Sequence, residues 1–229
     1  MTRFRDPHIW WPLVLAPLLA LLFESTPLDR ALIGYYYDAS VHAFPLRDDA
    51  FLQNVMHSGT KLLVIGIAFA VFGAFLLTYL LPQWEPHRRR LLWIAAGMAG
   101  GSLLVSLLKH GSALHCPWDL AEYGGYAPFH GLFDMLPGGV AAGRCFPGGH
   151  ASGGFALMAF YFGLRDTSAR TARLFLAAGL AAGMIMGWSQ MMRGAHFLSH
   201  NVWSGWVVWM YLAVQYAAFP PARRAVAAA

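Results

Sequence analysis

Three short polar segments interrupt an otherwise apolar chain, and their residue types suit phosphate chemistry. They cover residues 109–117 (KHGSALHCP), 147–150 (PGGH) and 189–200 (SQMMRGAHFLSH). Each lies at the end of an apolar run, where an ionisable side chain is costly unless it serves a site. Together they supply a lysine, an arginine, a glycine turn and histidines. This set predicts a site that acts on the phosphate of a lipid.

The second segment predicts an anion-binding turn. Gly148 and Gly149 precede an apolar helical run, so their backbone N–H groups are expected at a helix N-terminus. Unpaired donors and the helix dipole attract anions at such an end. A plain helix start with a flexible turn is the alternative. His150 favours the anion site, because its ring would lie at the mouth of a bound phosphate.

The third segment places two histidines one helical turn apart. His196 and His200 can share a helix face. The spacing also fits a metal-binding pair, but no acidic residue completes an HExxH arrangement, and we predict no metal. Arg193, with Ser189 one turn earlier, is typical of a phosphate clamp beside a nucleophilic histidine. A solvated pair of interface histidines is the alternative.

Composition predicts an integral membrane protein. The chain has 229 residues, of which 58% are hydrophobic and 12% are charged, whereas a soluble domain carries about 25% charged residues. Basic patches interleaved with aromatic residues are absent, which argues against a nucleic-acid partner. Nothing in the sequence indicates a second domain, so we treat residues 1–229 as one domain. The sequence is silent on the oligomeric state.

The apolar runs predict an all-α bundle of six transmembrane helices. A spanning helix needs about 20 mainly apolar residues. Six stretches approach this length: residues 9–23, 62–81, 91–108, 150–164, 174–192 and 201–219. The first is interpreted as a retained anchor, because no small-residue cleavage motif follows it.

The basic residues predict the orientation of the bundle. With a cytoplasmic N-terminus, 10 of the 16 basic residues fall on the inside and 6 on the outside, as the positive-inside rule requires. Both termini are then cytoplasmic, and the three polar segments face outward. This arrangement fits a bacterial inner membrane with a periplasmic site.

The long segment 110–146 is expected to be an extracytoplasmic active-site loop, because unstructured loops above about 15 residues usually serve function. It carries Asp119, Asp134 and a group of aromatic residues. Cys116 and Cys145 both lie in it and can form a disulfide in an oxidising compartment. Two small buried hydrophobic side chains are the alternative.

The three segments resemble the signature of the type 2 phosphatidic acid phosphatase superfamily, which also includes the vanadium haloperoxidases. That signature is a lysine, six residues and Arg-Pro, then Pro-Ser-Gly-His, then Ser-Arg, five residues, His, three residues and Asp. The resemblance covers residues 109–200 and the six-span layout. Seven positions match in order: Lys109, Pro117, Pro147, Gly149, His150, Ser189 and His196.

Four positions depart from the signature. Cys116 and Gln190 replace its two arginines, Gly148 replaces the serine and His200 replaces the aspartate. The resemblance implies that Lys109 and Ser189 help to bind phosphate, and Arg193 or Arg144 could replace a lost clamp. His200 itself, Asp119 or Asp134 could orient the nucleophile.

The resemblance implies a lipid phosphatase that uses neither metal nor cofactor and cleaves a phosphomonoester or a diphosphate. His196 would form a phosphohistidine, and His150 would act as general acid and then as general base. A lipid phosphotransferase and a catalytically inactive lipid-binding protein are the alternatives. A transporter fits less well, because the polar residues gather at one membrane face rather than at the midplane. A haloperoxidase would require vanadate. The sequence does not identify the lipid.

Overall fold

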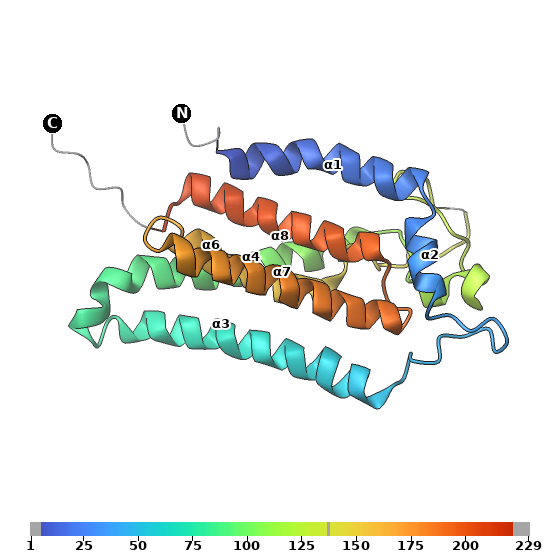
Figure 1. Ribbon diagram of the computed structural model, residues 1–229, viewed down its shortest axis with the longest axis horizontal. Helices are drawn as coiled ribbons and strands as arrows, with labels where there is room; N and C mark the ends of the chain where they lie inside the picture. Colours follow the sequence, from blue (N-terminus) through green and yellow to red (C-terminus); the bar gives the residue numbers. More distant parts are fainter. Residues whose placement is uncertain (1–5, 137, 222–229) are drawn as a thin grey trace.

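The apolar stretches fold into long helices that run side by side. The computed structural model describes residues 6–136 and 138–221. Figure 1 shows α1 (Pro7–Ser25) and α3 (Thr60–Leu77) along two outer edges, with the other long helices between them. These inner helices are α4 (Arg88–Gly111), α7 (Ala169–Met192) and α8 (Leu198–Ala218). Within the described residues the structure is all-α, and its β structure is limited to two isolated bridges.

Four helical segments are long and apolar enough to cross a membrane. They cover Pro7–Ser25, Phe51–Leu77, Pro82–Gly111 and Ala169–Met192. The stretch 150–164 instead forms two short helices, α5 (Gly149–Phe155) and α6 (Met158–Leu164). Helix α8 contains the last expected stretch, but polar residues in its first turns reduce its hydropathy. The expected all-α class is therefore confirmed, whereas the count of six spans is not.

The centre of the bundle is close-packed because small residues let helices approach. Phe155, Met158, Phe162, Val208 and Leu212 form part of its buried core. At Gly154, an added Cβ would lie 2.4 Å from the backbone nitrogen of Gly183 in α7. Only glycine permits helices α5 and α7 to come this close.

The outer helices present apolar side chains outward. Trp11 of α1 is 72% exposed, and Leu62 and Phe69 of α3 are 67% and 71% exposed. A soluble protein rarely exposes contiguous apolar surface on this scale, whereas a membrane protein presents such surface to lipid. These faces therefore agree with a bundle embedded in a bilayer.

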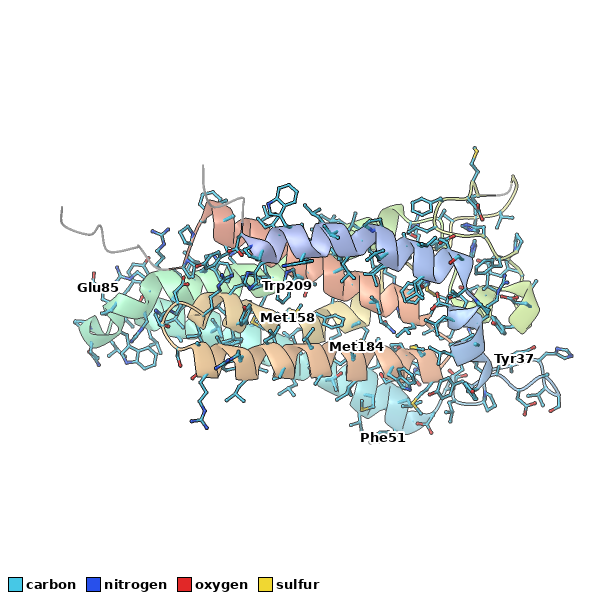
Figure 2. All side chains as sticks on the ribbon, turned by 45° about the horizontal axis from the view of Figure 1, so that its top comes forward. Tyr37, Phe51, Glu85, Met158, Met184 and Trp209 are labelled. Carbon is cyan, nitrogen blue, oxygen red and sulfur yellow. A yellow bond between two sulfur atoms is a disulfide. The ribbon has the colours of Figure 1, made fainter. Side chains whose placement is uncertain are left out.

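One end of the bundle carries a cap of short elements. The cap contains α2 (Leu28–Gly34) and the 3-10 helices η4 (Pro117–Asp119) and η5 (Ala121–Tyr123). A small apolar cluster that includes Ile33, Phe44, Leu120 and Phe197 holds it together. Figure 2 shows Tyr37 at this end and Glu85 at the opposite one, where the 3-10 helix η3 (Pro82–His87) turns the chain. Helix α4 ends, α5 begins and α7 turns into α8 beneath the cap.

Candidate active site

A tight turn between α7 and α8 positions His196. Gly194 has φ of 73°, and a Cβ at this position would lie 2.4 Å from the ring of Phe44. The turn is closed by the N–H of Gly194, which donates to the carbonyl of Met191, and by the N–H of Ala195, which donates to that of Gln190. A glycine is therefore required just before the histidine, both for the backbone conformation and for space.

His196 and His200 contact each other in a buried pair. Their Nδ1 atoms lie 3.3 Å apart, and their exposed fractions are 5% and 3%. Two bare lone pairs would repel at this distance, so one Nδ1 carries a hydrogen. If His196 is the donor, its Nε2 keeps a lone pair and can attack an electrophile. His200 is then in position to orient the ring, at the position where the aspartate of the signature is missing.

The surroundings keep His196 neutral. Burial, followed by the neighbouring His200, Lys109, His150 and His57, holds the pKa of its imidazole well below its usual range. A neutral imidazole is the nucleophilic form. His196 therefore has the protonation state that an attack on phosphorus requires at neutral pH.

His150 begins α5 and is held by the segment that precedes α3. Its Nε2 lies 2.9 Å from the carbonyl oxygen of Met56 and 3.3 Å from the hydroxyl of Thr60. The ring of His57 lies against it, with the two ring centroids 4.5 Å apart. The expected site histidine thus has a histidine neighbour from a distant part of the chain.

His57 was not among the predicted site residues, because it lies before the second apolar run, residues 62–81. The structure instead has a π-helix, Phe51–Gly59, that continues directly into α3. One signal was available in the sequence. His57, Thr60 and Lys61 have i, i+3, i+4 spacing, which places them on one helix face.

Lys109 lies beside the start of α5. A Cβ added at Gly149 would be 3.8 Å from the Nζ of Lys109, so the amine lies against the glycine turn. The structure therefore brings together Lys109, Gly149 and His150, as the motif spacing indicated. Lys61 of α3 lines the same cavity and adds a second amine.

Arg193 adjoins the glutamine that replaces the second signature arginine. Its Nη1 donates to the side-chain oxygen of Gln190 at 3.3 Å, and its Nε donates to the carbonyl of Arg47 at 2.9 Å. Arg193 is buried and close enough to His57 for their charges to interact. Ser189 is also buried, but its hydroxyl donates to the carbonyl of Met186 within α7.

Gly148 has a packing role that explains the missing serine. A Cβ at this position would lie 2.7 Å from the side-chain oxygen of Asn201, which is fully buried in α8. The N–H of Gly148 donates to the carbonyl of His200 at 2.8 Å. In this conformation the Gly148 amide is therefore not free to bind phosphate. The sequence had predicted that the Gly148 N–H would bind an anion.

Three of the candidate residues lie away from this cluster. Arg144 is exposed and its φ is 52°. Asp119 belongs to η4, where its backbone carbonyl accepts from Tyr126 and Ala127. The carboxylate of Asp134 accepts from the N–H of Gly131 in the loop. None of the three lines the large cavity beside His150.

Cys116 and Cys145 form a disulfide beside the nucleophile candidate. Their Cα atoms are 5.2 Å apart, and the sulfur of Cys145 lies 3.3 Å from the Nδ1 of His196. These three side chains cluster as metal ligands would. Metal binding by cysteine requires thiolates, however, and sulfurs bonded to each other are not thiolates. The bridge therefore acts as a wall of the site.

A large cavity extends from the cluster between α3, α4 and α5, with a volume of about 860 Å³. His57, Lys61, Lys109 and His150 line its polar mouth. The remainder is mainly apolar, with Ser102, Ser106 and Ser152 as its polar residues, and it reaches toward the opposite end of the bundle. Residues that line this part are Val64, Ile65, Ala68, Phe69, Phe72, Leu92, Ala95, Ala96, Met98, Ala99, Ala156 and Met186.

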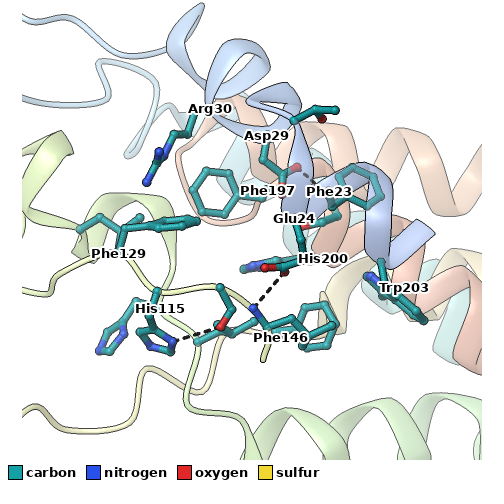
Figure 3. Close-up of a pocket in the computed structure, with 18 of the residues that line it drawn as sticks. Phe23, Glu24, Asp29, Arg30, His115, Phe129, Phe146, Phe197, His200 and Trp203 are labelled. Carbon is teal, nitrogen blue, oxygen red and sulfur yellow. Dashed lines mark hydrogen bonds between the residues drawn. The ribbon is translucent and has the colours of Figure 1, made fainter. Parts of the chain in front are cut away.

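A second, smaller cavity of about 120 Å³ lies beside His200. Figure 3 shows Asp29 and Glu24 reaching it from the α1–α2 region and His115 reaching it from the loop before α5. The carboxylate of Asp29 accepts from the N–H of Ser199 at 2.9 Å. Burial raises the pKa of Asp29 to about 6. His200 thus contacts His196 and also faces a cavity lined by acidic and basic side chains.

Comparison with known proteins gives one match. A family model described as the PAP2 superfamily matches residues 90–224, from the first turn of α4 past the end of α8. No curated protein and no solved structure matches the chain. The matched segment contains the site residues Lys109, Gly149, His150, Arg193, His196 and His200. His57 and Lys61 precede it.

Proposed function

The chain belongs to the PAP2 superfamily, which supports a phosphatase-type activity, and we propose that it removes phosphate from a lipid at the outer face of a membrane. The reaction proceeds through a phosphohistidine on His196. The substrate is a lipid phosphomonoester or diphosphate. No metal or cofactor takes part in this scheme.

The observation that carries the proposal is the shape of the large cavity. Its mouth holds two amines and two imidazoles, and its remainder is mainly apolar. On α4 it extends from Lys109 to Leu92, and 17 residues of helix span about 25 Å. This length suits a long acyl or prenyl chain lying between α3 and α4, with its phosphate at the mouth.

The charges at the mouth suit a phosphate dianion. Lys61 and Lys109 line the cavity, and Arg193 lies close to the imidazoles. Positive groups preorganised around the equatorial oxygens stabilise the charge that phosphoryl transfer distributes over them. Lys61 and Arg193, which are not part of the signature, therefore supply positive charge in place of its two lost arginines.

In the first step the Nε2 of His196 attacks phosphorus. The bond from phosphorus to the lipid oxygen breaks, and an imidazolium at the cavity mouth gives that oxygen its proton. His196 keeps the hydrogen on its Nδ1, where His200 holds it. The products are a lipid alcohol, or a lipid monophosphate from a diphosphate, and phosphohistidine.

In the second step water attacks the phosphohistidine. A neutral imidazole at the mouth takes a proton from the water as the phosphorus–nitrogen bond breaks. Phosphate leaves and His196 is regenerated. The family resemblance implies that both proton transfers involve His150, which lines the mouth.

Two features support the outer face as the location. The disulfide requires an oxidising compartment, as the periplasm is. Arg88, Arg89, Arg90 and Arg165 lie toward the end of the bundle opposite the cap, as the positive-inside rule requires for a cytoplasmic end. The chain is then a multi-pass protein of the bacterial inner membrane with cytoplasmic termini.

The test is phosphate release by the purified protein in detergent with EDTA, against a panel of lipid mono- and diphosphates. We expect release that His196→Ala abolishes. His87→Ala, which changes an exposed histidine of η3, should match the wild type. Release that survives His196→Ala would refute the assignment. Phosphate transferred to a second lipid would identify a phosphotransferase, and no reaction with any lipid would identify a binding protein.

A further inference from the structure

We propose that His57 is a second catalytic histidine, the acid that protonates the leaving oxygen, while His150 is the base that activates water. This inference rests on the proposed function and divides between two residues the proton transfers assigned above to His150. His57 belongs to none of the three polar segments and lies outside the segment matched to the family.

The π-helix brings His57 to the site. Its nine residues, Phe51–Gly59, have a wider turn than an α-helix, and π segments occur frequently at functional sites. The ring of His57 lies 4.5 Å from that of His150, centroid to centroid, with 31° between the ring planes. Both rings line the polar mouth of the cavity, beside Lys61 and Lys109.

The hydrogen bonds of His150 favour a base. Its Nε2 lies 2.9 Å from the carbonyl oxygen of Met56, which also accepts from the hydroxyl of Thr60. A carbonyl oxygen cannot donate, so the hydrogen of a neutral His150 is on Nε2. Its Nδ1 then carries a lone pair. In this tautomer His150 can take a proton from water but has none to give.

His57 has the complementary property, because its Nδ1 is not committed elsewhere. Within the described part of the chain this Nδ1 is buried without a hydrogen-bond partner, and the side chain of Gln190 lies within reach of the ring. A buried polar atom without a partner is costly. A substrate group at the cavity mouth would supply the missing interaction.

The charges of the site couple protonation of His57 to substrate binding. Its charged and titratable neighbours are Lys61 on α3, Lys109 on α4, His150 on α5, and Arg193 and His196 after α7. In the empty site these cations oppose a further positive charge. A phosphate dianion in the mouth reverses this balance and favours the imidazolium form of His57. The acid is thus formed when substrate is present.

The proton transfers balance over the cycle. As the bond from phosphorus to His196 forms and the bond to the lipid oxygen breaks, His57 gives its proton to that oxygen and becomes neutral. Water then attacks phosphorus, and its proton passes to His150. The two rings are adjacent, so one proton transfer from His150 to His57 restores the starting state.

The test compares two leaving groups on matched chains, dodecyl phosphate and a dodecyl-substituted nitrophenyl phosphate. An alkoxide requires a proton to leave, whereas a nitrophenolate does not. We expect His57→Gln to lower turnover of dodecyl phosphate by about 10²–10⁴-fold and that of the nitrophenyl ester by less than tenfold. With His150→Gln, the nitrophenyl ester should give a burst of nitrophenol followed by slow turnover.

The controls separate this inference from the function on which it rests. His110→Gln, which changes an exposed histidine at the end of α4, should not affect either substrate. Equal losses on both substrates for a folded His57→Gln protein would overturn the acid role while leaving the phosphatase intact. If the wild type hydrolyses neither substrate and no lipid phosphate, the proposed function fails first.

Discussion

At the scale of single residues, the proposed nucleophile His196 has a partner that differs from the one in the family signature. His200 stands at the aspartate position of the family signature, and its Nδ1 lies 3.3 Å from that of His196. A histidine can accept the Nδ1–H of the nucleophile as a carboxylate would, without introducing a negative charge. The four departures from the signature therefore leave an orienting partner in place.

The first prediction concerns this partner. His200→Ala should lower phosphate release by about 10²–10⁴-fold, because the nucleophile loses the group that fixes its tautomer. His200→Asp should retain much more activity than His200→Ala, because a carboxylate accepts the same hydrogen. Rates are measured on protein whose thermal unfolding in detergent is unchanged. Wild-type turnover by His200→Ala would show that the pair has no orienting role.

Asp29 gives a prediction on stability. Burial raises its pKa from 3.8 to about 6, so the unfolded chain releases this proton at lower pH than the folded protein does. Stability therefore falls as pH rises from about 4 to about 6, by roughly 3 kcal/mol for this interval. Asp29→Asn should abolish this loss of stability with rising pH. Thermal midpoints across this pH range in detergent provide the measurement.

The control for the Asp29→Asn variant is Asp48→Asn, which changes an exposed carboxyl group. Its midpoints should follow those of the wild type at every pH. If the midpoints of Asp29→Asn also follow the wild type, the carboxyl of Asp29 is not held in its neutral form by burial.

Site residues could be predicted from the sequence where they lie in short motifs of fixed spacing. Lys109, Gly149, His150 and His196 occur in short motifs, and the structure brings them together. His57 and Asp29 occur in no such motif, because their positions depend on how a π-helix and α2 pack against distant parts of the chain. The same limit applies to Gly148, whose requirement for glycine comes from Asn201.

At the scale of elements, the disulfide ties the cap to the site. It joins positions 29 residues apart, and Cys145 immediately precedes the segment that leads into α5. The sulfur of Cys145 also contacts His196. The bridge therefore fixes the loop and contributes to the wall behind the nucleophile.

We predict that Cys116→Ala/Cys145→Ala lowers the free energy of unfolding by roughly 3–4 kcal/mol, through greater freedom of the unfolded chain. Phosphate release should fall as well, because His196 loses a packing partner. A reductant should reproduce both effects in the wild type and have none in the double variant. A wild type that is insensitive to reduction in both properties would contradict this role.

Helix lengths could be predicted only where the apolar run is continuous. The sequence predicts membrane spans at residues 62–81 and 91–108, and α3 and α4 correspond to them. The run 150–164 divides into α5 and α6 because i to i−3 hydrogen bonds, such as that from Leu157 to Gly154, tighten the helix there. The order of residue types does not reveal such a local change of winding.

At the scale of the whole molecule, the bundle combines a polar end with a lateral apolar cavity. The polar mouth lies beneath the cap, and the apolar remainder passes between α3 and α4. In the proposed function, a lipid held there keeps its chain at membrane depth with its phosphate at the polar mouth. The sequence indicates a membrane bundle, but the cavity depends on how far apart α3 and α4 lie.

This arrangement predicts a dependence on chain length. Ala99 lines the apolar part of the cavity, so Ala99→Trp should obstruct it. We expect at least about a tenfold loss of kcat/KM for a lipid phosphate with a 16-carbon chain, or about 1.4 kcal/mol. A short-chain phosphate should be affected much less. Ala181→Trp, on an exposed face of α7, is the matched control. Equal losses for both chain lengths would place the lipid elsewhere.

The central claim is that phosphate passes through His196, and trapping the intermediate tests it most directly. The protein is mixed with a lipid labelled on its terminal phosphate, quenched within one turnover and digested. We predict a label that is stable in alkali, labile in acid and carried by the peptide that contains His196, and that is absent from His196→Ala. Label on another residue, or phosphate release from the wild type without any labelled protein, would contradict the account.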